Sequence, residues 1–262
     1  MIFSIIINTH NQQKTIIKCI NSCLNQNFNQ KFEIIITDTS DNSLENKIKL
    51  IKSKKIIYKH YRKNFSNIPE INQLKKIYNG CKIAKGKWFF LLDGDDYFKQ
   101  NKLKYMYNNI DLKNNIIIQD KVNYDYNFLK NNYVYRKFIS LWPEIYGTSC
   151  LSGNINFLKK FFKSINLNRW NMLAIDVLLI LYSKKCDKFN SLNKILTIKN
   201  ITPNSVGSKY DFFSKKYWLR RNQQIKYWEN INKKKIYNLD KIVSNLLMFF
   251  IKKNINFFLK KT

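Results

Sequence analysis

The sequence is poor in residues that break regular structure and in residues that carry negative charge. Its 262 residues include only 6 glycines and 3 prolines, and its 17 acidic residues are set against 47 lysines and arginines. Hydrophobic residues make up 45% of the chain, which excludes a largely disordered protein. The formal net charge of +30 favours acidic partners, such as nucleic acid, an anionic membrane surface or a phosphorylated substrate.

Cysteine and histidine are also scarce. The chain has 5 cysteines, an odd number, and 2 histidines, and no pair of cysteines has CxxC spacing. This pattern argues against a disulfide framework and against a zinc site, and it favours reduced thiols in the cytosol. Cys19 and Cys23 lie one helical turn apart, which predicts packing in a core.

Long hydrophobic runs are missing as well. No stretch reaches the roughly 18 apolar residues that a membrane-spanning helix needs. The N-terminal segment MIFSIIIN has no basic residues before its short apolar run, so it predicts a strand and not a signal peptide. We therefore expect a cytoplasmic protein that is soluble or peripheral on the inner face of the cell membrane.

Short apolar runs alternate with helical patterns in the first hundred residues. We predict strands at residues 3–7, 32–37, 55–61 and 88–92, and helices at residues 12–26, 42–53 and 69–84. This alternation is typical of an α/β fold, in which helices cover a mostly parallel sheet. In such sheets, ligands bind beyond the carboxyl ends of the strands.

The remainder of the chain is less regular. We predict helices at residues 99–109, 154–164 and 170–183, short strands within 115–137, and a loop at 195–208. Two basic helices that carry aromatic residues follow, at 212–228 and 239–259. We thus expect an α/β domain over residues 1–208 and a basic, aromatic helical region over residues 209–262.

Polar residues follow the predicted strands at the positions where a ligand is expected. The first strand leads into Thr9, His10 and Asn11, the second into Asp38, and the fourth into the acidic segment LLDGDD. Mg²⁺ prefers carboxylate oxygens and commonly takes one or two of them together with substrate phosphates. The acidic segment is therefore a candidate metal site; the alternative is a solvated turn that caps the next helix.

Four segments together resemble the glycosyltransferases of family 2, which have the GT-A fold. They are SIIINTHN (4–11), EIIITDTSDNS (33–43), NGCKIAKGKWFFLLDGDD (79–96) and the triplet AID (174–176). They occur in the family's order and cover roughly the first two-thirds of the chain. The resemblance implies a GT-A type, Rossmann-like domain in which residues 1–97 bind a nucleotide-sugar donor and residues 98–208 face the acceptor.

The resemblance also implies roles for individual residues. Thr9 and His10 take the places of a Thr-Tyr pair that contacts the base; for His10 the alternative is a solvated strand-end residue. Asp38 takes the place of an acid that contacts uracil or ribose, with helix capping as the alternative. Asp93 and Asp95 form the DXD pair, and Gly94 keeps the turn between them small. With Asn11, these residues are the expected nucleotide-sugar site, and Asp93 and Asp95 are the expected ligands of Mg²⁺ or Mn²⁺.

Asp176 is the candidate catalytic base. Family members carry a Glu-Asp pair at the start of a helix, and here the pair is Ile175-Asp176. Asp176 is the one charged residue of the segment MLAIDVLLILY, so we expect a carboxylate in apolar surroundings, where it would be costly unless it had a function. The alternative is a residue on a solvent-facing side of the helix.

Other positions depart from the family's pattern. Asn8 replaces a proline before Thr9, and Ile77 and Tyr78 replace an Arg-Asn pair. The loss of the arginine leaves the identity of the nucleotide open, although Lys75 and Lys76 lie close by in the sequence. The resemblance implies inverting transfer from a UDP-sugar to a glycan hydroxyl; two rival interpretations are a catalytically silent glycosyltransferase-like binding protein and a basic nucleic-acid-binding protein.

The last third of the chain interleaves cations with aromatic residues, as in KKYWLRR and FFIKKNINFFLKK. Such a helix can lie on an anionic membrane, which would suit an enzyme that acts on lipid-linked glycans. It can also bind nucleic acid, which we disfavour, or simply pack with its lysines in solvent. A chain rich in Lys, Asn and Ile indicates a low-GC genome; with the resemblance, it suggests bacterial capsule or lipooligosaccharide synthesis.

Overall fold

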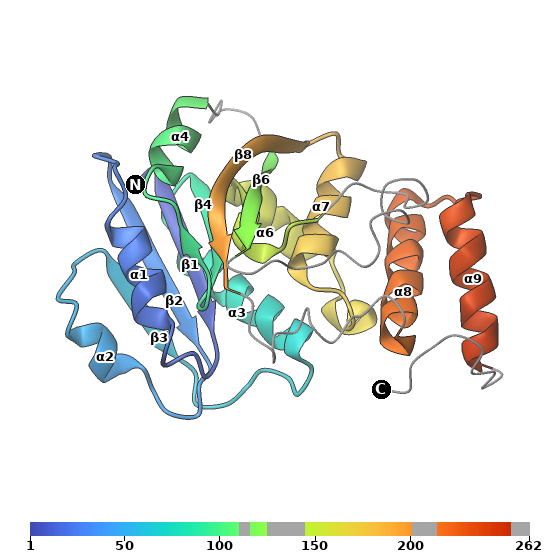
Figure 1. Ribbon diagram of the computed structural model, residues 1–262, viewed down its shortest axis with the longest axis horizontal. Coiled ribbons are helices and arrows are strands. Elements are labelled where there is room, and N and C mark those ends of the chain that lie inside the picture. The colour runs from blue at the N-terminus through green and yellow to red at the C-terminus, as the bar shows by residue number, and fades with distance from the viewer. Residues whose placement is uncertain (110–115, 125–144, 201–213, 253–262) are drawn as a thin grey trace. The chain divides into compact units, whose positions relative to one another are not determined.

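A computed structural model of the protein describes residues 1–109, 116–124, 145–200 and 214–252 (Figure 1). The chain forms two compact units. The first comprises Met1–Asp125 and Tyr146–Asn200, and the second comprises Tyr126–Ile145 and Ile201–Thr262. The predicted domain boundary at residue 208 falls outside the described residues and stays a prediction.

The first unit is built on one eight-stranded sheet with the order β3-β2-β1-β4-β7-β6-β8-β5. Its strands are β1 (Phe3–Thr9), β2 (Phe32–Asp38), β3 (Ile56–His60), β4 (Trp88–Asp93), β5 (Tyr97–Phe98), β6 (Ile117–Tyr124), β7 (Leu151–Asn154) and β8 (Phe189–Lys199). Its helices are α1 (Ile16–Leu24), α2 (Glu45–Lys49), α3 (Pro69–Ile83), α4 (Lys102–Asn109), α6 (Ile155–Ser164) and α7 (Ile175–Lys185). Two short 3-10 turns, η1 (Thr148–Cys150) and η2 (Leu167–Trp170), precede β7 and α7.

Half of the sheet is purely parallel. Strands β3, β2, β1 and β4 all run in the same direction, so their carboxyl ends lie at one edge. The other half is mixed, because β7 is antiparallel to both β4 and β6, whereas β6 and β8 are parallel. The prediction of an α/β fold with a Rossmann-like sheet is confirmed for this unit.

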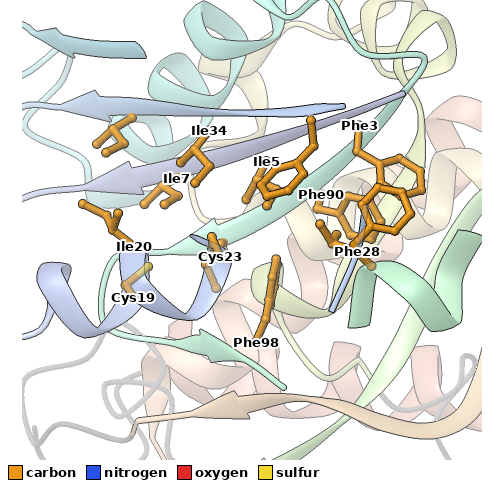
Figure 2. Close-up of a cluster of buried hydrophobic side chains, with 14 of the residues drawn as sticks. Phe3, Ile5, Ile7, Cys19, Ile20, Cys23, Phe28, Ile34, Phe90 and Phe98 are labelled. Carbon is orange, nitrogen blue, oxygen red and sulfur yellow. The ribbon is translucent and has the colours of Figure 1, made fainter. Parts of the chain in front are cut away.

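The core beneath α1 explains why the first strands read as continuous apolar runs. Every residue of β1 and β2 is buried, as expected for strands covered on both faces. Figure 2 shows Cys19 and Cys23 of α1 turned towards the isoleucines of the sheet, so the prediction that both cysteines pack in a core is confirmed. At the other end of the cluster, the Phe3 ring lies 5.0 Å from the rings of both Phe28 and Phe90.

Three sequence-based predictions need correction in this unit. The predicted loop at 195–208 is wrong for its first residues, because β8 extends to Lys199. This strand escaped detection because much of it is exposed, so it shows no apolar run. The helix predicted at 42–53 is only the short α2, and the helix predicted at 170–183 begins later, at Ile175.

The second unit contains α8 (Lys215–Asn232) and α9 (Leu239–Lys252), which pack against each other. Trp218 of α8 is buried against Val243, Leu247 and Met248 of α9. A search of the described residues finds no helix that is long and apolar enough to cross a membrane.

Candidate active site

The parallel half of the sheet brings the predicted strand-end residues together. In the strand register, Thr9 lies beside Asp38, and Asn8 lies beside Asp93. The loops after β1, β2 and β4 therefore share one edge of the sheet, which is the place where ligands bind in folds of this class.

The segment Asp93–Asp96, here called the acidic turn, is held tightly at this edge. The Asp96 N–H donates to the Asp93 carbonyl at 3.0 Å, and the Gly94 N–H donates to the Asn8 carbonyl at 3.0 Å. The Asp93 Oδ1 atom accepts hydrogen bonds from Asn8 Nδ2 at 2.7 Å and from Gln73 Nε2 at 2.9 Å. Neutral amide donors thus orient Asp93 without cancelling its charge.

Gly94 is required by the close approach of the loop after β1. A Cβ atom at this position would lie 2.8 Å from Thr9 Oγ1 and 2.9 Å from Thr9 Cβ. No real Cβ makes such contacts, so any other residue would push the acidic turn away from Thr9. Glycine at this position therefore lets the acidic turn lie against Thr9; its predicted place in a nucleotide-sugar site stays a prediction.

The acidic turn is electrostatically unfavourable as it stands. Burial and the charge of Asp93 raise the pKa of Asp95 to about 6. Burial, Asp93 and Asp95 together raise the pKa of Asp96 to about 8. The Lys199 ammonium opposes both shifts. Because the pKa values are raised by burial and by repulsion between like charges, a cation bound beside these carboxylates would stabilise their ionised forms.

The donor set fits a hard divalent cation that is completed by a substrate. Asp93 and Asp95 offer carboxylate oxygens, which Mg²⁺ and Mn²⁺ accept. Among the residues that the structure describes, no group of three or more His, Cys, Asp or Glu side chains is arranged to hold a metal. A cation at the acidic turn would therefore take its remaining ligands from water or from phosphate oxygens.

Lys76 of α3 brings a buried positive charge to the same strand ends. Its side chain is almost fully buried, and Nζ donates to the Thr9 carbonyl at 2.9 Å. Burial lowers the pKa of Lys76 to about 8, although the charges of Asp93, Asp38 and Asp95 act in the opposite direction. This lysine is thus within electrostatic reach of three of the acids at the site.

A buried polar network supports the acidic turn from behind. The Ser149 Oγ atom accepts from the Asp93 N–H at 3.0 Å and donates to Asp96 Oδ2 at 2.6 Å. The Ser149 carbonyl in turn accepts from Lys102 Nζ at 3.1 Å, and Lys102 forms a fully buried ion pair with Asp120 at 2.7 Å. One hydroxyl therefore joins both ends of the turn to a rigid interior.

Replacing Ser149 with alanine is expected to loosen the acidic turn. It would remove the hydroxyl that binds the Asp93 N–H and Asp96 Oδ2, and would leave Asp96 with the Asn200 N–H on Oδ1 at 3.0 Å. The expected cost is about 1–3 kcal/mol in the free energy of unfolding. Ser152 provides the matched control, since it is fully buried and its Oγ has no hydrogen-bond partner in the described structure. Ser152→Ala should be near neutral in a urea denaturation series, and equal losses in the two variants would contradict the role of Ser149.

Both carboxylate oxygens of Asp38 accept hydrogen bonds from other groups of the protein. It is fully buried; Oδ1 accepts from the Ser40 N–H at 2.8 Å and from Ser40 Oγ at 2.5 Å, and Oδ2 accepts from the Tyr58 hydroxyl at 2.7 Å. It shapes the loop after β2 and does not cap α2, which begins seven residues later, at Glu45. Its predicted contact with a base or ribose stays a prediction.

His10 and Asn11 tie the loop after β1 to the loop after β2. The His10 Nδ1–H donates to the Thr39 carbonyl at 2.8 Å, and the ring is only half-buried. Asn11 has a left-handed backbone (φ 54°), donates from Nδ2 to Asp41 Oδ2 at 2.8 Å and accepts from the Asp41 N–H at 3.0 Å. The half-buried His10 ring leaves part of its surface for a ligand to stack on.

Asp176 lies in the first turn of α7 and is half-buried, so it is less deeply buried than the apolar sequence around it predicted. The reason is the late start of the helix, which places Asp176 where the helix dipole favours negative charge. Its Oδ1 accepts from the Val177 N–H at 2.8 Å. A Cβ on Gly147 would lie 3.9 Å from Asp176 Oδ2 and 2.8 Å from Lys199 Nζ. Because Lys199 also acts on Asp95, Asp176 lies on the same side of the unit as the acidic turn.

The sequence of the chain matches a known protein family. The family model described as "Glycosyl transferase family 2" matches residues 4–169, which is more than half of the chain. The chain belongs to glycosyl transferase family 2. A search of curated protein sequences finds no significant match.

Solved structures agree with this glycosyltransferase in fold. TarS 1-349 from S. aureus in complex with UDP matches with a TM-score of 0.64 at 17% identity, covering 98% of this chain and 72% of that one. The same TarS fragment in complex with UDP-GlcNAc gives 0.64 at 17%, covering 98% and 73%. The mannosyltransferase PcManGT from Pyrobaculum calidifontis in complex with GDP-Man and Mn²⁺ gives 0.59 at 8%, covering 94% and 69%. The GT-A type fold is thereby confirmed.

Several residues that contact the acidic turn could not be found by sequence reasoning. Gln12 bonds to Asp95, Gln73 to Asp93, Ser149 to both ends of the acidic turn, and Lys199 acts on Asp95 and Asp96. They come from four separate segments and follow no motif. Only Asn8 carried a signal, because it stands where the family's proline is expected, and its amide is now seen to bind Asp93.

Proposed function

We propose that this glycosyltransferase moves a sugar from a nucleoside diphosphate, with UDP as the nucleotide, to a glycan hydroxyl with inversion at the anomeric carbon. The observation that carries the proposal is the acidic turn at the carboxyl ends of the parallel strands. It gathers three carboxylates in one partly buried place, and two of them have raised pKa values. A diphosphate with its divalent cation is the ligand that suits this place.

On the donor side, Asp93 and Asp95 would hold Mg²⁺ or Mn²⁺, and the bound cation would neutralise charge on the diphosphate. Thr9, His10 and Asn11 would lie along the nucleoside. Asp38 would contribute indirectly, because its hydrogen bonds to Ser40 hold the loop after β2 in place beside the nucleoside. The UDP and UDP-GlcNAc in the TarS structures, and the GDP-Man and Mn²⁺ in the PcManGT structure, support a donor of this class.

On the acceptor side, Asp176 would be the general base. Its carboxylate would take the proton of the acceptor hydroxyl while that oxygen forms a bond to the anomeric carbon. The bond between this carbon and the diphosphate oxygen would break, and the nucleotide would leave with its electron pair. Single displacement of this kind inverts the anomeric centre, and a positioned base contributes roughly 10²–10⁴-fold to the rate.

The proposed acceptor is a glycan or a lipid-linked glycan of a bacterial surface polysaccharide, such as capsule or lipooligosaccharide. It fits the family and a composition rich in Lys, Asn and Ile, which is typical of low-GC genomes. Such an acceptor would place the enzyme in the cytoplasm, at the inner face of the membrane. A nucleic-acid partner is disfavoured, because the described acids at the site would repel phosphates that arrive without a cation.

A thermal-shift screen of nucleotide sugars with and without Mn²⁺ tests the proposal. A donor at 100 times its Kd stabilises the folded state by about 2.7 kcal/mol, which for a chain of this size is a shift of about 5–10 °C. We expect UDP-sugars to give this shift only with the cation. A shift without any later transfer or hydrolysis would favour the catalytically silent alternative. Salt-sensitive binding to oligonucleotides, with no response to UDP and Mn²⁺, would favour the nucleic-acid alternative.

A further inference from the structure

Helix α9 presents an apolar stripe on its outer side. Leu239, Ile242, Leu246 and Phe250 are spaced three, four and four residues apart, so they lie along one face of the helix. Their side chains are 39–56% exposed. Isolated exposed apolar residues are ordinary, but a continuous stripe along a helix marks an interaction surface.

The stripe is not a face that α9 needs for its own packing. The opposite side of the helix already packs on α8, through Val243, Leu247 and Met248 around Trp218. Asp240 is fully buried and accepts a hydrogen bond from Arg221 Nε at 3.0 Å, which fixes this inner side against α8. The outer stripe is therefore a second apolar surface of α9, in addition to the inner one that packs on α8.

Positive charge gathers in the turn that precedes the stripe. The turn before α9 carries the exposed side chains of Lys233, Lys234 and Lys235. In α8 and α9 the acidic residues are Glu229 and Asp240; Glu229 pairs with Lys241 at 2.6 Å, and Asp240 pairs with Arg221. Glu229 also lies within electrostatic reach of Lys235, so this one acid faces both Lys241 and Lys235, and the turn with its three lysines keeps a net positive charge.

We propose that the outer face of α9 docks on the surface of an anionic lipid bilayer, with the stripe at the level of the acyl chains and the lysines among the headgroups. The positive charge of the turn before α9 favours an anionic bilayer over a second copy of the chain as the partner. A second copy of the chain would bring like-charged lysine clusters together, whereas an anionic leaflet attracts each lysine by about 1 kcal/mol. An apolar stripe with basic residues beside it is the pattern of a helix that lies in the interface plane.

The proposal deepens the proposed function, since it places the enzyme where a lipid-linked acceptor resides. Lipid binding itself requires no donor, cation or acceptor. Binding and transfer can therefore fail separately, and a test of the helix remains meaningful even if the proposed reaction is wrong.

Vesicle sedimentation of the full chain tests the proposal. The chain should sediment with vesicles of phosphatidylcholine and phosphatidylglycerol and much less with phosphatidylcholine alone. The double variant Ile242→Ser/Leu246→Ser leaves the net charge unchanged and should bind at least about tenfold more weakly. Lys234→Ser/Lys235→Ser should lose roughly tenfold or more, because it removes two headgroup contacts.

Two controls make the result specific. Lys54→Ser/Lys87→Ser removes the same charge from two exposed lysines of the first unit and should bind as the native chain does. All variants should keep the native circular dichroism spectrum, because the substituted side chains are exposed. Equal binding to neutral and anionic vesicles, or native binding by Ile242→Ser/Leu246→Ser, overturns the proposal. So does a native dimer in light scattering that this variant abolishes without any change in vesicle binding.

Discussion

Asp95→Asn is expected to abolish the Mn²⁺-dependent stabilisation by a UDP-sugar and to reduce transfer by at least about 10²-fold. The amide offers one neutral oxygen in place of a charged carboxylate, so the pair loses much of its attraction for a hard cation. The shift of about 5–10 °C expected for the native chain should disappear. Differential scanning fluorimetry with donor, with and without Mn²⁺, measures the first effect, and release of UDP measures the second.

Asp187→Asn is the matched control for this variant. It removes the same charge from an exposed turn residue whose left-handed backbone (φ 53°) asparagine adopts readily. This control should keep both the metal-dependent shift and the activity. A native response of Asp95→Asn to Mn²⁺ and donor would show that the cation, if one is needed, binds elsewhere.

Without a cation, the same substitution should stabilise the protein. The pKa of Asp95 is about 6 in the folded state, above the ordinary value near 3.9. The ionised carboxylate is therefore disfavoured by folding; this penalty is absent below pH 4 and grows as the pH rises to about 7. The melting temperature of Asp95→Asn in the presence of a chelator should exceed that of the native chain at pH 7, and the difference should vanish near pH 4. Such an opposition between stability and function is common at binding sites.

The fold was predictable where burial is complete. Strands β1, β2 and β4 are covered on both faces and therefore appear in the sequence as unbroken apolar runs. Strand β7 (Leu151–Asn154) is too short to give a pattern, and the first seven residues of β8 are exposed or only partly buried, so neither strand could be recognised. Strand pairing across a mixed sheet depends on contacts between distant segments, which no local pattern records.

The site was predictable only where function demands a local motif. The acidic turn and Gly94 stand in one short segment directly after an apolar strand, so the sequence could indicate a candidate metal site there. Ser149 and Gln73 reach the same turn from other elements, and each is an ordinary polar residue in its own surroundings. The position of Asp176 was misjudged because the start of α7 is set by η2 and the loop after it, which leave no apolar break in the sequence.

Asp176→Asn is expected to keep donor binding and lose turnover by about 10²–10⁴-fold, the usual contribution of a positioned base. The asparagine oxygen can still accept from the Val177 N–H, so the start of α7 should stay intact. The neutral amide cannot take a proton from the acceptor hydroxyl. Thermal shift with a UDP-sugar and Mn²⁺ should equal that of the native chain, while the rate of sugar transfer to saturating acceptor falls.

The two aspartate variants together separate the parts of the proposed reaction. Loss of donor binding in Asp95→Asn with retained binding in Asp176→Asn places the two carboxylates on opposite sides of the transfer, one towards the diphosphate and one towards the acceptor. Normal transfer by Asp176→Asn would remove Asp176 from the reaction. The base would then have to be sought among the other groups beside Gly147, where Asp176 and Lys199 lie within 4 Å of one point.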